Sequence, residues 1–181
     1  MNFVSSRSDV VRSSSQRWLL SYWERLRGAN TLPRWEGFEA DELAAMAESL
    51  SIQDVMGDDS NARFLIRFHG KRVAEAFGSS CQGRHLDEIL PPQYRDAALS
   101  TYYRVLATKL PVYTIADTRD RDGRIVHYER LLLPFSHDGV AINRILASLE
   151  TVSPEGEFDN RDLLTSSPKA PAFALCATIQ P

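Results

Sequence analysis

The sequence predicts a single α+β domain, because strand-like and helix-like segments come in separate blocks along the chain. Strand character occurs at residues 49–56 and 63–69, several helical segments follow, and three strand-like segments occupy 112–118, 125–136 and 141–151. The last three are separated by Asp122-Gly123 and Asp138-Gly139, and Asp-Gly pairs favour hairpin turns. This order predicts an antiparallel sheet rather than alternating β-α-β units.

The first helix is expected from residue 15 to residue 27. Its apolar residues recur at the spacing of one helix face, which consists of Trp18, Leu19, Tyr22, Trp23 and Leu26. A serine at 13–15 can cap the start of the helix, and Gly28 can end it. The apolar face either packs on its own domain or is shared with a second chain, and both alternatives stay open. The second alternative predicts a homodimer formed through this helix.

The middle of the chain predicts two strands and then helices. A loop at 31–37 leads to a short helical stretch at 40–49, and a polar turn at 57–61 joins the first two strands. The strand at 63–69 alternates, with Phe64, Ile66 and Phe68 on one face. Short helices at 71–77 and 86–90 precede a long helix at 93–108.

The chain divides into four predicted parts. Residues 1–14 are expected to be a flexible leader, 15–37 a helix and linker, 38–152 the folded domain, and 153–181 an extended tail. Four of the nine prolines lie beyond residue 152, which favours an extended tail. Removal of residues 156–181 is therefore expected to leave thermal unfolding nearly unchanged.

Composition limits the class of protein. A chain of 181 residues can bury a core without disulfides or a structural metal. With 21 basic and 24 acidic residues, the net charge of −3 argues against a dedicated nucleic-acid-binding protein. Cys81 and Cys176 cannot form a disulfide framework, which favours the reducing cytoplasm. The Ser- and Arg-rich residues 1–15 leave a transit peptide as a less favoured alternative.

The running order of two strands, a helical crossover and a three-stranded meander resembles a PAS domain. The segments that carry the resemblance lie at 63–70, 77–78, 83–90, 110–113, 122–124 and 128–134, together with Trp23-Glu24 and Leu32-Pro33. Over residues 17–151 the chain is similar to short bacterial PAS proteins in which this fold forms nearly the whole chain. The resemblance implies a five-stranded antiparallel sheet with helices over one face, and a sensory or regulatory role without shared catalytic residues.

A curved sheet covered by short helices leaves a cavity that alternate strand residues line. The predicted lining is Ile66, Phe68, Tyr102, Tyr113, Leu131 and Leu133. A small ligand there would shift the packing of sheet and flanking helix by its difference in affinity for two states. We therefore expect a non-catalytic cytoplasmic sensor without a resident cofactor. It is expected to act as a homodimer on an unidentified protein partner, without binding nucleic acid or a membrane.

Three motifs suggest other chemistry, each less strongly. Residues 118–129 match an EF-hand loop at several positions, but Thr118 stands where an acid is expected and the flanks look like strands. Cys81 and His85 have the spacing of one zinc-ligand pair, but a structural zinc site needs four ligands. His127 and Glu129 share a strand face, which is more typical of a surface hydrogen bond than of a general base.

Cofactor-binding and enzymatic alternatives also stay open. The residues beside Cys81 lack the pattern of photoactive flavin-binding PAS proteins, and the helix at 93–108 lacks the histidine of haem-binding ones. Haem could then be bound only through His69 or His85. A haem or flavin sensor and a small enzyme using the same cavity are therefore the alternative functions.

Overall fold

The computed structural model describes residues 1–37, 40–57, 61–165 and 170–180, and its strands form one mixed sheet. The order of strands across the sheet is β1-β7-β4-β5-β6-β2-β3. In chain order, the strands are β1 (Val4–Ser6), β2 (Leu50–Met56), β3 (Arg63–His69), β4 (Val112–Arg119), β5 (Ile125–Phe135), β6 (Arg144–Val152) and β7 (Ala172–Ile179). β1 pairs with β7 in parallel, and the other described pairs are antiparallel.

The α-helices are α1 (Ser14–Arg27), α2 (Lys71–Ala76), α3 (Leu86–Ile89) and α4 (Pro92–Thr108). Three 3-10 helices are η1 (Ser8–Val10), η2 (Trp35–Gly37) and η3 (Ala40–Ser49). None of the described helices is long and apolar enough to cross a bilayer. The helices and the five strands that the sequence predicts are all present in the structure, with bounds that differ by a few residues. The predicted turn at 57–61 and the predicted domain start at residue 38 lie partly outside the described residues.

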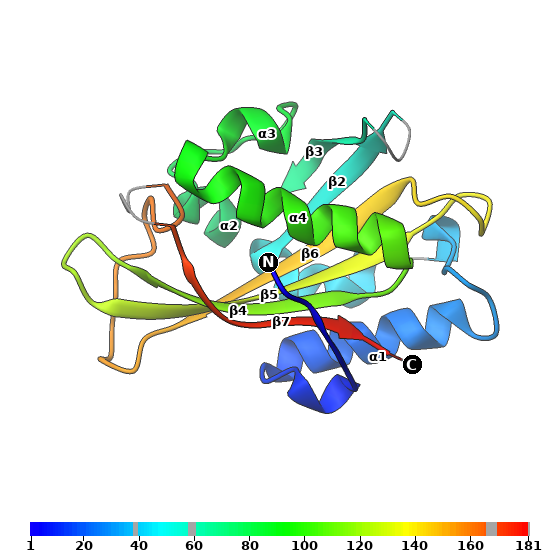
Figure 1. Cartoon of the computed structure of the whole chain (residues 1–181), viewed down its shortest axis with the longest axis horizontal. Coiled ribbons are helices and arrows are strands. Elements are labelled where there is room, and N and C mark those ends of the chain that lie inside the picture. Colours follow the sequence, from blue (N-terminus) through cyan, green and yellow to red (C-terminus); the bar gives the residue numbers. More distant parts are fainter. Residues whose placement is uncertain (38–39, 58–60, 166–169, 181) are drawn as a thin grey trace.

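The expected number of strands was too low, because the C-terminal part of the chain adds β7 beside β4 and the N-terminal part adds β1 beside β7 (Figure 1). The predicted extended tail contains β7, which pairs with β4 from Val112 to Asp117. Ala177 and Ile179 of β7 are almost completely buried. Pro171 precedes the strand and does not interrupt its ladder, so the proline content was a poor guide. β7 satisfies backbone groups of β4 that would otherwise form an open sheet edge.

The predicted flexible leader is also ordered in part. Val4, Ser5 and Ser6 pair with residues 177–179 of β7, and Val11 is completely buried in the core. The division into leader, domain and tail therefore does not describe the fold, since residues from both ends complete one sheet.

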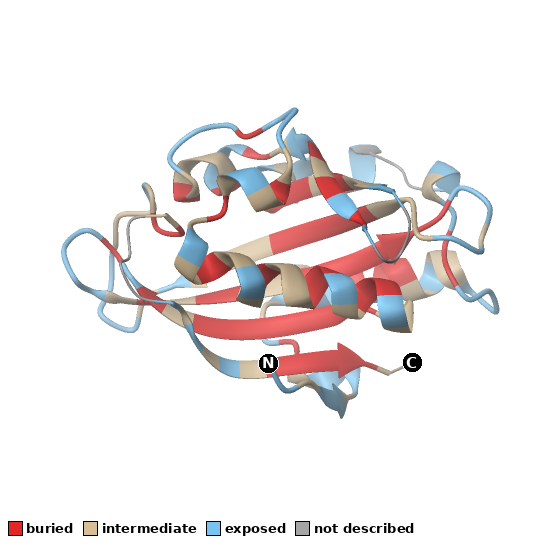
Figure 2. Cartoon of the chain, turned by 45° about the horizontal axis from the view of Figure 1, so that its top comes forward, coloured by how far each residue is buried: buried red, intermediate tan, exposed pale blue. Residues whose placement is uncertain are grey.

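Helices cover both faces of the sheet, whereas the resemblance implied one covered face (Figures 1 and 2). Residues of α3 and α4 form one hydrophobic cluster with Ile66, Val112 and Leu132. Residues of α1 and η3 form a second cluster with Tyr113 and Leu131. Because adjacent strand residues point to opposite faces, Leu131 and Leu132 belong to different clusters.

The apolar side of α1 packs on its own sheet. Ser13 caps the helix by accepting a hydrogen bond from the Gln16 backbone N–H, and Gly28 ends it with a positive φ of 53°. Trp23 is 1% exposed, and its indole N–H donates to the Pro134 carbonyl at 2.6 Å. Trp18, in contrast, is 41% exposed and stacks on Tyr22. The alternative in which the whole face is shared with a second chain is therefore restricted to Trp18 and its surroundings.

Candidate functional site

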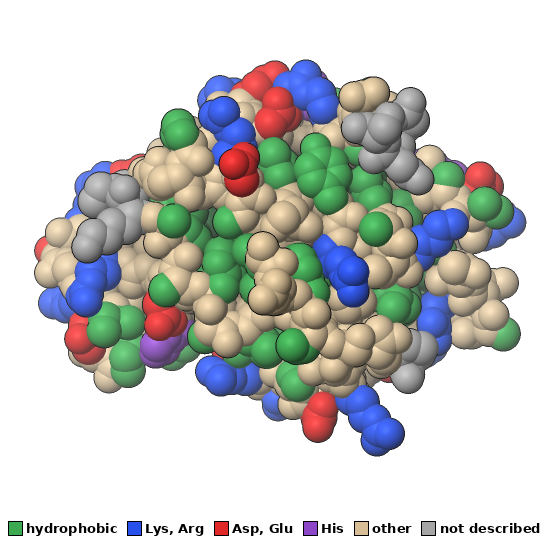
Figure 3. Space-filling model, viewed as in Figure 1, with side chains coloured by type: hydrophobic (Ala, Val, Ile, Leu, Met, Phe, Trp, Pro, Cys, Tyr) green, Lys and Arg blue, Asp and Glu red, His purple; other side chains and the backbone are tan. Residues whose placement is uncertain are grey.

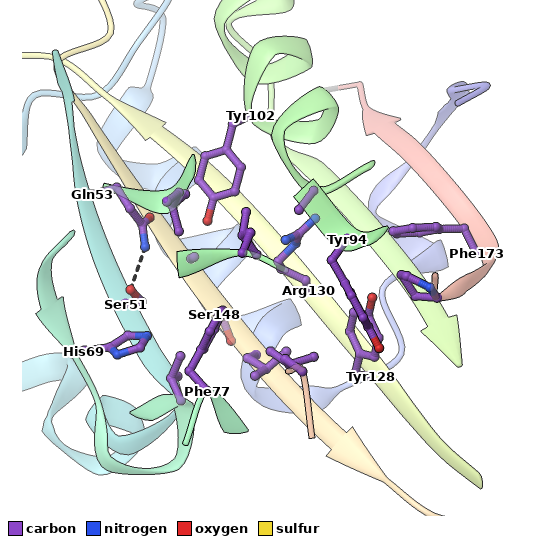
Figure 4. A pocket seen from close by; sticks show the side chains of 18 residues that line it. Ser51, Gln53, His69, Phe77, Tyr94, Tyr102, Tyr128, Arg130, Ser148 and Phe173 are labelled. Carbon is purple, nitrogen blue, oxygen red and sulfur yellow. Dashed lines mark hydrogen bonds between the residues drawn. The ribbon is translucent and has the colours of Figure 1, made fainter. Parts of the chain in front are cut away.

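A cavity of about 60 Å³ lies between the sheet and helices α2, α3 and α4. Figure 4 shows His69 and Phe77 at one end, Tyr94, Tyr128 and Phe173 at the other, and Arg130 between them. Most of the wall is apolar. Its aliphatic part comprises Val73, Leu86, Leu90, Ala98, Ala147, Leu149 and Leu164. The outer surface of the same side also shows hydrophobic side chains between charged groups (Figure 3).

Arg130 is the cation among the described residues that line the cavity. Its Nη2 donates to Thr101 Oγ1 at 2.8 Å, and its guanidinium lies 5.6 Å from the centroid of the Tyr102 ring. Its Nε is buried without a hydrogen-bond partner. Because an arginine stays protonated in a protein, the cavity contains a permanent positive charge.

Three tyrosines line the same cavity, and one of them, Tyr94, has its hydroxyl 3.3 Å from Thr118 Oγ1. Tyr102 comes from α4 and Tyr128 from β5, and both side chains are largely buried. Burial raises the pKa of both phenols, against the smaller opposing effect of Arg130. Both hydroxyls therefore stay protonated and can donate hydrogen bonds.

His69 is held as a neutral hydrogen-bonding residue. Its Nδ1 accepts from the Cys81 backbone N–H at 3.2 Å, which leaves the proton on Nε2. Burial lowers the pKa of His69 to about 4. Near neutral pH the ring is therefore a donor through Nε2 and carries no charge.

Gln53 and Ser51 line the cavity from β2. The Gln53 side-chain amide donates to Ser51 Oγ at 2.6 Å, and Ser51 Oγ donates to the Phe68 carbonyl. Gln53 Oε1 is buried without a partner. Among the described residues that line the cavity, Gln53 and Arg130 thus each have a buried polar atom without a hydrogen-bond partner, Gln53 Oε1 and Arg130 Nε.

The predicted lining matches the cavity in one residue of six, Tyr102. Ile66 packs under the helices, in the hydrophobic cluster beside the cavity. Tyr113, Leu131 and Leu133 point to the opposite face, toward α1. The sequence predicted the wrong face of β4 and β5 as the cavity wall, because both faces of these strands are apolar.

Phe68 was misplaced for a different reason. The pairing register of β2 and β3 shifts between Ile52 and Gln53, so that Ile52 faces Phe68 and Gln53 faces Ile66. Arg67 is the extra residue, and a bulge of this kind breaks the alternation of side chains. Phe68 is consequently 37% exposed.

The sequence analysis did not predict Tyr128 and Arg130 as lining residues. Along β5 they alternate with Leu131 and Leu133, which it did predict. It also missed Leu164 and Phe173, because these belong to the segment expected to be a tail. The Leu164 N–H donates to the Ala76 carbonyl at 2.8 Å, which holds this segment against α2. The apolar run from Phe173 to Ile179, which forms most of β7, was the available signal.

The five residues of the predicted partner helix divide between core and surface. Leu19 and Trp23 belong to the cluster on the α1 side, Leu26 packs against it, and Tyr22 is buried. Trp18 is the exposed one. Its neighbour Tyr22 lies 5.0 Å below the Arg25 guanidinium.

Residues 118–129 form a β-hairpin and not a calcium-binding loop. Asp120 Oδ1 accepts from the Asp122 and Arg124 backbone N–H groups at 3.0 and 2.8 Å, which closes the turn. Glu129, which stands at the twelfth position of the EF-hand-like segment, accepts hydrogen bonds from Tyr113 and Ser13 instead. Among the described residues, no three His, Cys, Asp or Glu side chains are grouped where they could hold a metal ion.

The remaining motif residues have structural partners. Cys81 is buried, which raises the pKa of its thiol, and His85 caps α3 in a box with Glu88. His127 Nδ1 lies 2.6 Å from Asp117 Oδ1 on the adjacent strand, so its partner is Asp117 and not Glu129.

Comparison with known proteins agrees with this architecture. The PAS domain family model matches residues 11–150, from the residues before α1 to β6. A comparison with curated proteins found no match. The match covers well over half of the chain, and β2 to β6 with α2 to α4 form the sheet and helices around the cavity. The chain therefore belongs to the PAS domain family.

Proposed function

We propose that the protein is a non-catalytic sensor in which a small molecule occupies the cavity and alters contact with another protein. Membership of the PAS domain family indicates a sensory or regulatory role in general. The observation that carries the proposal is the cavity itself, where Arg130 Nε and Gln53 Oε1 are buried without partners. Buried polar groups are normally hydrogen-bonded, so a molecule that satisfies these atoms would be stabilised there.

The volume of the cavity restricts the ligand. At about 60 Å³ it is far below the roughly 300–1,000 Å³ of sites for drug-sized molecules. We therefore propose a ligand of a few heavy atoms, held mainly by the apolar wall and oriented by the polar groups.

Strand β5 connects the cavity with α1. Tyr128 and Arg130 face the cavity, whereas Glu129 between them faces α1. The Glu129 carbonyl accepts from the Gln16 side-chain amide at 3.0 Å, and its carboxylate accepts from the Ser13 backbone N–H at 3.2 Å. A ligand that prefers one position of β5 would thereby favour one position of α1, by its difference in affinity for the two states.

The output is proposed to be protein–protein contact through the exposed part of α1. Trp18 is a large exposed aromatic residue on this helix, and aromatic residues are enriched in interfaces. We propose that a second copy of the chain packs here as a homodimer and that a further protein partner receives the signal. A cytoplasmic location remains part of this proposal.

The test compares small molecules on the wild type and on a variant with a filled cavity. Thermal unfolding is measured with a panel of neutral, acidic and basic compounds for the wild type, Ala98→Leu and Ala107→Leu. Ala98 lines the cavity, whereas Ala107 is exposed on the same helix and serves as the control. Some compounds are expected to raise the Tm of the wild type and Ala107→Leu but not of Ala98→Leu. Equal effects on all three, or no effect, would contradict the proposal.

A further inference from the structure

The charges around the cavity are unbalanced. Arg130 is cationic, and none of the described residues that line the cavity is Asp or Glu. Some other arginines have acidic partners, such as Arg63 with Asp87 and Arg144 with Asp54, whereas Arg95 and Arg104 donate to the Leu90 carbonyl and the Thr178 hydroxyl. No described carboxylate lies within ion-pair distance of Arg130, whose one hydrogen bond is to the neutral Thr101 hydroxyl. Arg130 is half-buried with a buried Nε, and a partly desolvated cation without a counter-ion is costly, so an anion entering the cavity would relieve part of that cost.

Other hydrogen-bonding groups of the cavity lining favour the same sign of ligand. Tyr102 and Tyr128 have protonated hydroxyls, and no described residue accepts a hydrogen bond from either one. His69 presents an N–H at Nε2, because its Nδ1 already accepts from Cys81. The guanidinium, the two phenols and this imidazole are donors, and an anion is an acceptor of several hydrogen bonds, whereas Gln53 Oε1 in the same lining is an acceptor that a carboxylate leaves unsatisfied.

The size and the apolar wall restrict the anion further. A single cation balances a monoanion, whereas a dianion such as phosphate would leave an uncompensated charge in an apolar space. A carboxylate matches the planar guanidinium with two parallel hydrogen bonds. The aliphatic side chains of Leu86, Leu90 and Leu149 in the lining favour an apolar tail on the anion.

We propose that the ligand of this PAS cavity is a short aliphatic monocarboxylate whose carboxylate is bound by Arg130, a proposal that rests on the cavity being a ligand site. Acetate to butyrate represents the class, because a cavity of about 60 Å³ holds only a few heavy atoms. Tyr102 and Tyr128 orient the carboxylate, and the leucines contact the alkyl tail.

Isothermal titration calorimetry with acetate, butyrate, butyramide and inorganic phosphate tests the proposal. Butyrate is expected to bind the wild type at least about tenfold more tightly than butyramide, since an ionised acceptor strengthens the hydrogen bonds to arginine. Arg130→Gln is expected to weaken butyrate binding at least about tenfold and to remove the preference over butyramide. Arg104→Gln is the matched control, because Arg104 bonds to Thr178 and lies outside the cavity lining.

Each other result has a defined meaning. Tighter binding of phosphate than of butyrate, or butyrate binding that is unchanged in Arg130→Gln, would overturn the carboxylate assignment. If Arg130→Gln does not fold, the preference of the wild type for butyrate over butyramide remains decisive. Neutral compounds that stabilise the wild type but not Ala98→Leu, without carboxylate binding, would overturn this inference and leave the proposed function intact. Absence of any binding sensitive to Ala98→Leu would overturn both.

Discussion

Glu129 and Arg130 are consecutive residues of β5 whose side chains serve opposite faces of the sheet. Arg130 lines the cavity beneath α4, while Glu129 accepts hydrogen bonds from Tyr113 at 2.6 Å and from the Ser13 backbone at 3.2 Å. Tyr113 Oη in turn accepts from the Arg12 backbone N–H. The positive charge of Arg130 in the cavity is thus one residue away from the Glu129 carboxylate, which binds the Ser13 N–H at the start of α1. This adjacency underlies the proposed coupling between cavity and helix.

Glu129→Gln is expected to lower the free energy of unfolding by about 1–3 kcal/mol, because charge-assisted hydrogen bonds to Tyr113 and Ser13 become neutral ones. Urea unfolding of Glu129→Gln, Tyr113→Phe and the double variant measures the coupling between the two side chains. Glu157→Gln, at an exposed position, is the control and is expected to change stability by less than about 0.5 kcal/mol. Strictly additive effects of the two substitutions would contradict the pairing.

Ile179→Ala is expected to cost about 2–5 kcal/mol, since Ile179 is buried at the end of β7. In a chain of this length such a loss lowers the Tm by roughly 4–20 °C. Ala174→Ser, at an exposed position of the same strand, is expected to have almost no effect. Thermal unfolding followed by circular dichroism checks both variants, and an unchanged Tm for Ile179→Ala would show that β7 does not pack in the sheet.

The two tryptophans of α1 are expected to differ in what they control. Trp23→Ala should destabilise the fold by about 3–5 kcal/mol, because Trp23 is buried and donates to Pro134. Trp18→Glu should leave stability within about 1 kcal/mol and convert the proposed dimer to a monomer, because Trp18 is exposed. Light scattering with chemical unfolding separates the effects. A monomeric wild type, or a dimer unaffected by Trp18→Glu, would be evidence against a dimer through α1.

Stability is expected to fall as the pH decreases from about 6.5 to about 4, because the pKa of His69 is lowered to about 4 by burial. In this window the unfolded chain binds a proton at His69 and the folded chain does not, so acid favours unfolding. The loss is on the order of 1–2 kcal/mol, less than full linkage because the ring is partly exposed. His69→Asn, which can still accept from the Cys81 N–H, should flatten the profile when urea unfolding is measured across this range. An equal slope in both proteins would argue that His69 is not responsible.

The local elements could be predicted because short-range patterns determine them. Ser13 and Gly28 mark the ends of α1 through capping groups and a positive φ, which depend on neighbouring residues. Pro92 begins α4 in the same way, and the Asp-Gly pairs mark the turns after β4 and β5. These features require no knowledge of the rest of the fold.

The cavity lining could not be predicted from period-2 alternation. Leu131, Leu132 and Leu133 are all buried, because helices cover β5 on both faces. A strand that is apolar on both faces carries no mark of which side meets which helix. For this reason the sequence analysis did not predict Arg130 as a lining residue, although it directly precedes these leucines in the chain.

The amino-acid order alone was enough to establish the α+β class, the strands β2 to β6, the long helix and the PAS resemblance. These features follow from local propensity and from the order of the segments along the chain. The assignment of faces, the docking of β7 beside β4 and the position of Arg130 in the cavity depend on contacts between distant residues. Ala177 and Val4 pair across almost the whole length of the chain, and no local pattern encodes such a pairing. Burial and the hydrogen-bonding needs of the sheet edge explain why these segments come together.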